Sequence, residues 1–164
     1  MIPPWTLDEL PFEPTLDDFG FIYQIDYDDG TSYIGKKNIW IYEELPPLKS
    51  GKKRENVVNT VNRSVKLTKE ELSTRTPTQI RTNVQSKVVP MDVVRKPSAW
   101  RSYTGSSALT KNKTIISRIV LATAPTKRYL TYLEVKALLC LNVLEDDKYL
   151  NENILGKFFK GNLI

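Results

Sequence analysis

Two short runs of strand-forming residues with a turn between them stand out near the start of the chain. Phe21 to Tyr27 is rich in β-branched and aromatic residues, and Thr31 to Ile34 resumes the same composition. Between them, Asp28-Asp29-Gly30 supplies residues that favour a tight turn. The pattern predicts a β-hairpin.

The length of the hairpin turn decides which side chains share a face. A two-residue loop would put Tyr23 and Tyr33 on opposite faces of the hairpin. A three-residue loop, residues 28–30, puts Tyr33 opposite Ile25, so that both tyrosines share a face as diagonal neighbours roughly 7 to 8 Å apart. We expect the three-residue loop.

Three further elements follow Trp100. A short helix is expected around Ser107 to Lys113, and the β-branched run Thr114 to Leu121 predicts a third strand. Thr126 to Leu144 has the apolar spacing of an amphipathic helix, which we take as the main helix. Its apolar stripe consists of Leu130, Leu133, Ala137, Leu138 and Leu141.

The two remaining segments show weaker patterns. Residues 1–18 contain four prolines and five acidic residues, a composition that favours an arm over a regular element. Residues 38–99 have weak periodicity and are expected to form a long basic insertion, mostly loop. Within them, Thr68 to Glu71 has capping-box spacing and predicts a short helix that ends before Pro77.

Together these elements predict an α/β (α+β) fold. It consists of a small antiparallel sheet of about three strands flanked by helices, with the long basic insertion after the first hairpin. The predicted organisation is an acidic arm at residues 1–18 and a single domain at residues 19–164.

Charge is unevenly distributed along the chain. Residues 1–37 have two Lys against eight acids, residues 38–99 have twelve Lys and Arg against six acids, and residues 100–164 have ten against five. The basic body suits a polyanionic partner. The chain has no histidine, which excludes histidine metal ligands and a histidine general base, and a single cysteine cannot build a zinc knuckle.

The cysteine content and hydropathy bear on the cellular compartment. Cys140 has no partner for an internal disulfide, and we expect it to be a small core residue. No apolar run approaches the roughly 20 residues of a membrane span. We expect a protein of the cytoplasm that does not interact with membranes.

Several motifs occur in an order that resembles one enzyme family. Phe21-Ile-Tyr23 is followed ten positions later by Tyr33-Ile-Gly35-Lys-Lys, with a glycine one place before the first triplet at Gly20. This pair is similar to the signature of the GIY-YIG nuclease superfamily. Further elements occur in the order of its bacteriophage homing-type endonucleases: Pro46-Pro-Leu-Lys with Gly51-Lys-Lys-Arg54, Trp100-Arg-Ser-Tyr-Thr-Gly-Ser-Ser107, Tyr132-Leu-Glu134 and Tyr149-Leu-Asn151. Residues 55–97 are longer and more divergent than that subgroup leads us to expect.

The resemblance implies hydrolysis of DNA phosphodiester bonds with the help of Mg²⁺ or Mn²⁺. Glu134 matches the family glutamate that binds the metal, and a hard carboxylate suits Mg²⁺. Tyr23 or Tyr33 would activate the water, with help from Lys36. Because a phenol has a pKa near 10, this role requires nearby positive charge to lower it. The ordinary alternatives are strand tyrosines and a solvated helix glutamate.

The resemblance also implies a phosphate-contacting arginine and a supporting asparagine. Arg101 is the first candidate for the arginine and Arg54 the second, while Tyr103 occupies a place where relatives often have histidine. Asn151 matches the family asparagine, with Asn153 as a nearby competitor. A surface arginine and a turn asparagine are the alternatives.

Double-stranded DNA is the expected partner. Ser106 and Ser107 could present amides and hydroxyls to a phosphate, or Ser107 could be a plain N-cap. We expect no separate recognition module, so specificity should come from the insertion, from a partner or from a homodimer. The candidate backbone-contacting cations are Lys37, Lys49, Lys52, Lys53 and Arg54.

Two other functions remain open at the level of sequence. One is a non-catalytic DNA- or protein-binding module that keeps the GIY-YIG fold, and the absence of histidine leaves room for it. The other is a structural or assembly protein that uses the acidic arm. Plasmid nicking in the presence and absence of a divalent metal separates both from a nuclease.

Overall fold

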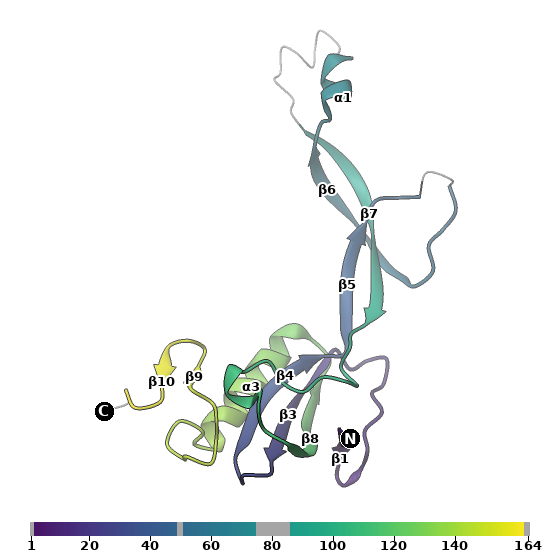
Figure 1. Ribbon diagram of the computed structural model, residues 1–164. Helices are drawn as coiled ribbons and strands as arrows, with labels where there is room; N and C mark the ends of the chain where they lie inside the picture. Colours follow the sequence, from purple (N-terminus) through teal and green to yellow (C-terminus); the bar gives the residue numbers. More distant parts are fainter. Residues whose placement is uncertain (1, 49–50, 75–85, 163–164) are drawn as a thin grey trace. The chain divides into compact units, whose positions relative to one another are not determined.

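The computed structural model describes residues 2–48, 51–74 and 86–162 of the chain (Figure 1). The chain divides into two compact units. Unit 1 comprises residues 1–40 and 97–164, and unit 2 comprises residues 41–96. Unit 2 falls within the predicted insertion.

Unit 1 is built on a five-stranded mixed sheet with the strand order β2-β1-β8-β3-β4. β1 runs parallel to β8, whereas β1 with β2, β3 with β4 and β3 with β8 are antiparallel. β4 therefore forms one edge of the sheet. The strands are β1 (Trp5–Leu7), β2 (Leu10–Pro11), β3 (Gly20–Tyr27), β4 (Ser32–Asn38) and β8 (Ile115–Ala124).

The β3–β4 hairpin has the predicted three-residue turn. The Tyr27 amide donates a hydrogen bond to the Thr31 carbonyl at 2.9 Å, which closes the turn around residues 28–30. Gly30 has a φ of 81°, a conformation that suits a residue without a side chain. The register pairs Ile25 with Tyr33, so the expected arrangement of the two tyrosines on one face is confirmed.

Alternation along β3 gives the sheet two buried faces. The tyrosine face carries an aromatic cluster whose buried members are Trp5, Phe12, Phe21, Tyr23, Ile25, Tyr27, Ile39, Trp100 and Val120. The helix face is covered by α3 (Lys127–Cys140). The buried residues of the core on this helix face are Ile22, Ile34, Ala124, Leu130, Leu138, Val143, Leu144, Tyr149 and Ile154.

The N-terminal segment is part of this core, and the expectation of an arm without regular structure was wrong. Trp5 is 3% exposed and packs edge-on against Phe21 and Tyr23. Its indole Nε1 donates a hydrogen bond to the Trp100 carbonyl at 2.9 Å. The prolines do not prevent this arrangement, because β1 contains none and Pro11 lies in β2, an edge strand of the sheet.

The C-terminal part of unit 1 follows the predicted order with shorter elements. The expected helix at 107–113 is a single 3₁₀ turn, η1 (Ala108–Thr110), and α3 ends at Cys140. Cys140 is exposed, so its predicted place in the core was wrong. Two short strands, β9 (Asn153–Ile154) and β10 (Phe158–Phe159), form a separate antiparallel pair. No helix in the described ranges has the length and apolarity needed to cross a membrane.

Unit 2 is a three-stranded sheet with the order β5-β7-β6, and not mostly loop as expected. The strands are β5 (Trp40–Leu45), β6 (Val57–Lys66) and β7 (Ser86–Pro97). Nearly all of β6 is exposed, so this strand lacks the strict alternation of exposure in a half-buried sheet. This explains why the sequence pattern missed it.

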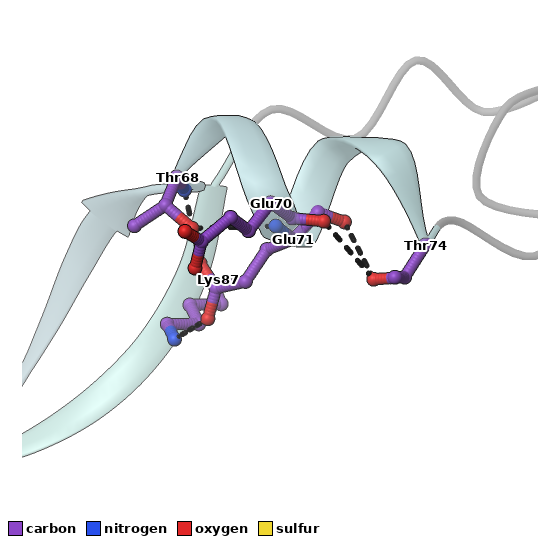
Figure 2. Close-up of polar contacts among 5 residues, drawn as sticks. All are labelled: Thr68, Glu70, Glu71, Thr74 and Lys87. Atoms are coloured by element: carbon purple, nitrogen blue, oxygen red, sulfur yellow. Dashed lines mark hydrogen bonds and ion pairs between the residues drawn. The ribbon is translucent and has the colours of Figure 1, made fainter.

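The predicted capping box is present at the end of β6. Figure 2 shows that the Thr68 side chain accepts a hydrogen bond from the Glu71 amide while the Glu71 carboxylate accepts one from the Thr68 amide. It opens α1 (Lys69–Ser73), which ends well before Pro77 as predicted. Lys87 of β7 pairs with Glu71, so the short helix is attached to the neighbouring strand.

The predicted fold class was wrong in its balance of elements. The described residues contain three sheets, of five, three and two strands, and two α-helices, one of them only five residues long. The protein is therefore mostly β. The prediction omitted the strands of unit 2, and it did not include β1 and β2 in the main sheet.

The position of β1 predicts the cost of removing its aromatic side chain. Trp5→Ala should lower the free energy of unfolding by about 3 to 5 kcal/mol, the usual range for a buried aromatic residue. Leu10→Ala is the matched control, because Leu10 belongs to the same segment and is 69% exposed. It should change stability by no more than about 0.5 kcal/mol in urea denaturation. Similar small effects from both changes would contradict the buried position of β1.

Candidate active site

The site begins with Tyr23 and Tyr33. Their rings lie next to Gly35, where the lack of a side chain leaves room for them. Their ring centroids are 6.4 Å apart, and Gly35 of β4 lies directly opposite Tyr23. A Cβ added to Gly35 would lie 2.5 Å from the phenol oxygen of Tyr23, closer than packing allows. Gly35 therefore lets the Tyr23 ring lie across β4.

Tyr103 joins the pair from the loop that follows Trp100. The hydroxyl of Tyr23 donates a hydrogen bond to the Tyr103 hydroxyl at 3.3 Å, and their rings meet edge to face. The Nζ atom of Lys37 lies 4.1 Å from the centre of the Tyr103 ring, a cation–π contact. The structure thus brings four of the predicted residues together, Tyr23, Tyr33, Tyr103 and Lys37.

Burial raises the pKa of both hairpin tyrosines. Tyr23 is 1% exposed, and loss of hydration moves its phenol pKa far above the ordinary value near 10, with the Tyr103 ring adding to the effect. The pKa of Tyr33 is raised by burial first, then by Tyr103 and by the carboxylate of Glu134. The shift is opposite to the lowering that we expected for a water-activating phenol. At neutral pH both tyrosines are hydrogen-bond donors and not phenolates.

Glu134 and Lys36 form an ion pair across the helix face of the sheet. Lys36 Nζ lies 2.7 Å from Glu134 Oε2 and also donates a hydrogen bond to Thr131 Oγ1 at 3.1 Å. Both side chains remain partly accessible, at 35% and 20%. Lys36 of β4 therefore holds the carboxylate of α3 in place.

The two groups of residues lie on opposite faces of the sheet and meet at its β4 edge. Tyr33 points to the tyrosine face, whereas Lys36 and Glu134 belong to the helix face. Glu134 thus does not share a face with the two tyrosines. Instead, a recess of about 530 Å³ lies at this edge, and Tyr33, Lys36 and Glu134 all line it.

Asn151 forms part of the recess wall and attaches the chain to the free edge of β4. Its Nδ2 donates to the Ile34 carbonyl at 2.8 Å, and its Oδ1 accepts from the Ile34 amide at 3.0 Å. Asn151 is 5% exposed, so these bonds are shielded from water. Both the oxygen and the nitrogen of its side-chain amide are hydrogen-bonded. Asn151 is therefore a structural support for the strand that carries Tyr33 and Lys36. Its competitor Asn153 is exposed and accepts from the Gly156 amide.

Arg101 does not reach the recess. Its guanidinium makes a paired contact with Glu13, at 2.9 and 3.1 Å, and lies over the ring of Trp100. Of the residues that the structure describes, no arginine lines the recess. The alternative, Arg54, belongs to unit 2 and pairs there with Asp92.

Arg118 is a buried residue of unit 1 that the sequence analysis missed. Its Nη1 donates to the carbonyls of Arg101 and Tyr103, at 2.9 and 3.0 Å, and its Nε donates to the Pro3 carbonyl at 2.6 Å. Burial lowers the pKa of this guanidinium. Arg118 thereby positions the loop that carries Tyr103. A charged residue within the apolar run Ile115 to Leu121 was the signal that could have identified it.

The predicted serines line the recess together with a residue that was not predicted. Ser106 and Ser107 form part of its wall, and the Ser107 side chain also caps η1 by accepting from the Leu109 amide. Glu152 adds a second carboxylate to the wall. The position of Glu152 next to Asn151 in the sequence could have identified it as a candidate site residue.

The predicted DNA-contacting cations are divided between the two units. Lys37 belongs to unit 1, and Lys52, Lys53 and Arg54 belong to unit 2, where they line a recess of about 460 Å³. Lys49 lies outside the described residues.

The donor set of the main recess fits a hard divalent cation. No group of three or more Asp, Glu, Cys or His side chains occurs in the described part of the chain. Glu134 and Glu152 do line the recess with hydroxyl and amide oxygens nearby. Mg²⁺ commonly uses one or two protein carboxylates and keeps several waters, so this arrangement fits Mg²⁺ better than a metal that needs a closed ligand cage.

The bonds of Asn151 predict a loss of stability when they are removed. Asn151→Ala should lower the free energy of unfolding by about 2 to 4 kcal/mol, because the buried amide and carbonyl of Ile34 lose their partner. Asn153→Ala is the control and should cost less than about 1 kcal/mol, because that side chain is exposed. Thermal and urea unfolding measure both. An Asn151→Ala protein of wild-type stability would contradict the structural role.

Comparison with known proteins identifies the family of the chain. A search of curated proteins and a search of solved structures found no match. Residues 5–154 match the family model SegE_GIY-YIG, described as "Putative endonuclease segE, GIY-YIG domain". The match begins at the first residue of β1, includes the whole of unit 2 and ends at the last residue of β9. Because this match covers most of the 164 residues of the chain, the chain belongs to the GIY-YIG nuclease superfamily.

Proposed function

We propose that the protein is a divalent-metal-dependent DNA endonuclease that hydrolyses phosphodiester bonds, of the phage homing type. The observation that carries the proposal is the recess at the β4 edge, where Tyr33, Lys36 and Glu134 from two faces of the sheet line one space. Hydrolysis of a phosphodiester requires a positioned water and positive charge near the phosphate. The recess walls offer groups for both tasks.

Tyr33 is the tyrosine that acts at the recess. It lines the wall, whereas Tyr23 is buried and does not. Because it lines the recess, Tyr33 can hydrogen-bond to the attacking water or to a phosphate oxygen and so position it. Tyr23 acts through Tyr103, whose hydroxyl accepts its hydrogen bond, and is a positioning residue.

Lys36 and Glu134 supply the charged groups. Lys36 is a cation at the recess wall and can offset charge on a bound phosphate. Glu134 is the residue that would hold Mg²⁺ or Mn²⁺, with Glu152 near it. When bound, such a metal supplies positive charge to the phosphate and acidifies bound water. Asn151 keeps β4 in position for both Tyr33 and Lys36.

A non-catalytic DNA-binding module with the same fold is the second candidate. One observation favours it: Arg101 pairs with Glu13 away from the recess, which leaves the described recess wall without an arginine. Its signature would be salt-sensitive DNA binding without cleavage in any divalent metal.

Glu134 provides the test of the proposed function. Glu134→Gln keeps the size of the side chain and removes its charge, and it should lower plasmid nicking in Mg²⁺ by on the order of 10³-fold or more. The circular dichroism spectrum should be unchanged, because the side chain lies on an accessible wall. Mg²⁺ should raise the melting temperature of the wild type and have less effect on the variant.

Glu145→Gln is the matched control. Glu145 follows α3, is exposed and does not line the main recess, so this change should leave nicking within about twofold. EDTA should abolish the wild-type activity. Wild-type nicking by Glu134→Gln would refute its role, and DNA binding without nicking by the wild type would favour the non-catalytic module.

A further inference from the structure

Unit 2 carries the excess positive charge of the protein. Residues 41–96 have twelve Lys and Arg against six Asp and Glu, a net charge of +6, whereas the rest of the chain has a net charge of −1. Four acids of unit 2, Glu43, Glu44, Glu71 and Asp92, are already paired with cations of the same unit. Within the described ranges, Lys52, Lys53, Lys66 and Lys69 make no ion pair.

The β6–β7 ribbon of this unit has two chemically different faces. The register places Thr60, Asn62, Ser64 and Lys66 of β6 on one face, which we call the polar face, opposite Asp92, Pro90, Val88 and Ser86 of β7. The other face, which we call the apolar face, carries Asn59, Val61, Arg63 and Val65 opposite Val93, Met91, Val89 and Lys87. The central valines and Met91 of the apolar face are half-buried, whereas the four β6 residues of the polar face are exposed.

Free cations lie at both ends of the polar face. At one end, Thr60 and Asp92 line the recess of about 460 Å³ together with Lys52, Lys53 and Arg54. At the other end, Lys66 is the last residue of β6, and Lys69 is the first residue of α1. Small hydrogen-bonding side chains occupy the positions between them. The distance from residue 60 to residue 66 is about 20 Å along a strand, which corresponds to about six base pairs of DNA.

We propose that the β6–β7 ribbon binds duplex DNA by placing its polar face in the major groove. A two-stranded β-ribbon fits this groove; β6 and β7 would supply its two strands, with β5 on the other edge of β7. Asn, Ser, Thr and Lys are side chains that hydrogen-bond to base edges there. Lys52 and Lys53 at one end and Lys69 at the other would contact the flanking phosphates. The inference deepens the proposed function, on which its choice of DNA as partner rests, by naming the element that selects the substrate.

Charge and side-chain type together favour DNA over a protein partner. A protein-binding sheet face is typically rich in large apolar and aromatic side chains at its centre. On β6 the centre of the polar face has Thr60, Asn62 and Ser64, and on β7 it has Pro90 and the exposed Val88, none of them aromatic. Its one acid, Asp92, is neutralised by Arg54. A polyanion with hydrogen-bonding groups in a groove complements such a surface.

The test compares two double variants that change the charge of β6 by the same amount. Asn62→Glu with Ser64→Glu alters the polar face, and Asn59→Glu with Val65→Glu alters the apolar face; all four positions are exposed. Binding of the full chain to a random-sequence 20-base-pair duplex is measured by fluorescence anisotropy in EDTA. The polar-face variant should bind about tenfold or more weakly than the apolar-face variant. Equal weakening in both variants would overturn the proposal.

Two further measurements keep the outcome clear. Lys66→Gln with Lys69→Gln changes only exposed side chains, and it should flatten the slope of log Kd against log salt concentration by about 0.9 for each phosphate that the variant no longer neutralises. An unchanged slope and affinity would contradict the ribbon as the DNA-binding element even if the glutamate variants misfold. The protein should displace methyl green from the major groove and leave netropsin in the minor groove, and the reverse result would overturn the choice of groove.

Plasmid nicking by the wild type separates this inference from the proposed function. Face-dependent binding without nicking in Mg²⁺ would leave the DNA-binding ribbon standing and remove the nuclease. Nicking combined with equal binding by the two double variants would keep the nuclease and remove the ribbon.

Discussion

The register of the β3–β4 hairpin is the constraint on which the site depends. The three-residue turn pairs Tyr33 with Ile25 and leaves Gly35 opposite Tyr23. A slip of one residue would turn Tyr33 to the helix face and place a side chain where the Tyr23 ring now lies across β4. The same register sends Lys36 to the helix face, where it meets Glu134. One turn therefore positions a phenol and an amine on opposite sides of one strand.

Placing those groups on opposite faces works only because β4 is an edge strand. In a central strand, the two faces would be separated by the neighbouring backbone, whereas at the edge both can open to one recess. An edge strand also has unpaired backbone groups, and Asn151 satisfies those of Ile34 with its amide. Burial at this edge also raises the phenol pKa of Tyr33.

Local signals predicted the parts of the structure that local sequence determines. The turn at residues 28–30, the capping box at Thr68 and the apolar stripe of the main helix were all confirmed. The pairing of β1 with β8 joins Trp5 to Arg118, far apart in the sequence, and no local pattern specifies such a contact. The sequence also located the phenols of Tyr23 and Tyr33 but could not show that burial would raise their pKa.

The division of charge between the units has a physical consequence for a substrate as highly charged as DNA. Unit 1, which holds the recess, has a net charge of −1, and its cation Lys36 is paired with Glu134. Long-range attraction of a polyanion must therefore come from the +6 of unit 2, whose free lysines are solvent-exposed. If unit 2 binds DNA as proposed, it would supply the long-range attraction that unit 1 lacks. Under the two proposals, the insertion would determine where the chain binds DNA, and the hairpin edge would determine what happens there.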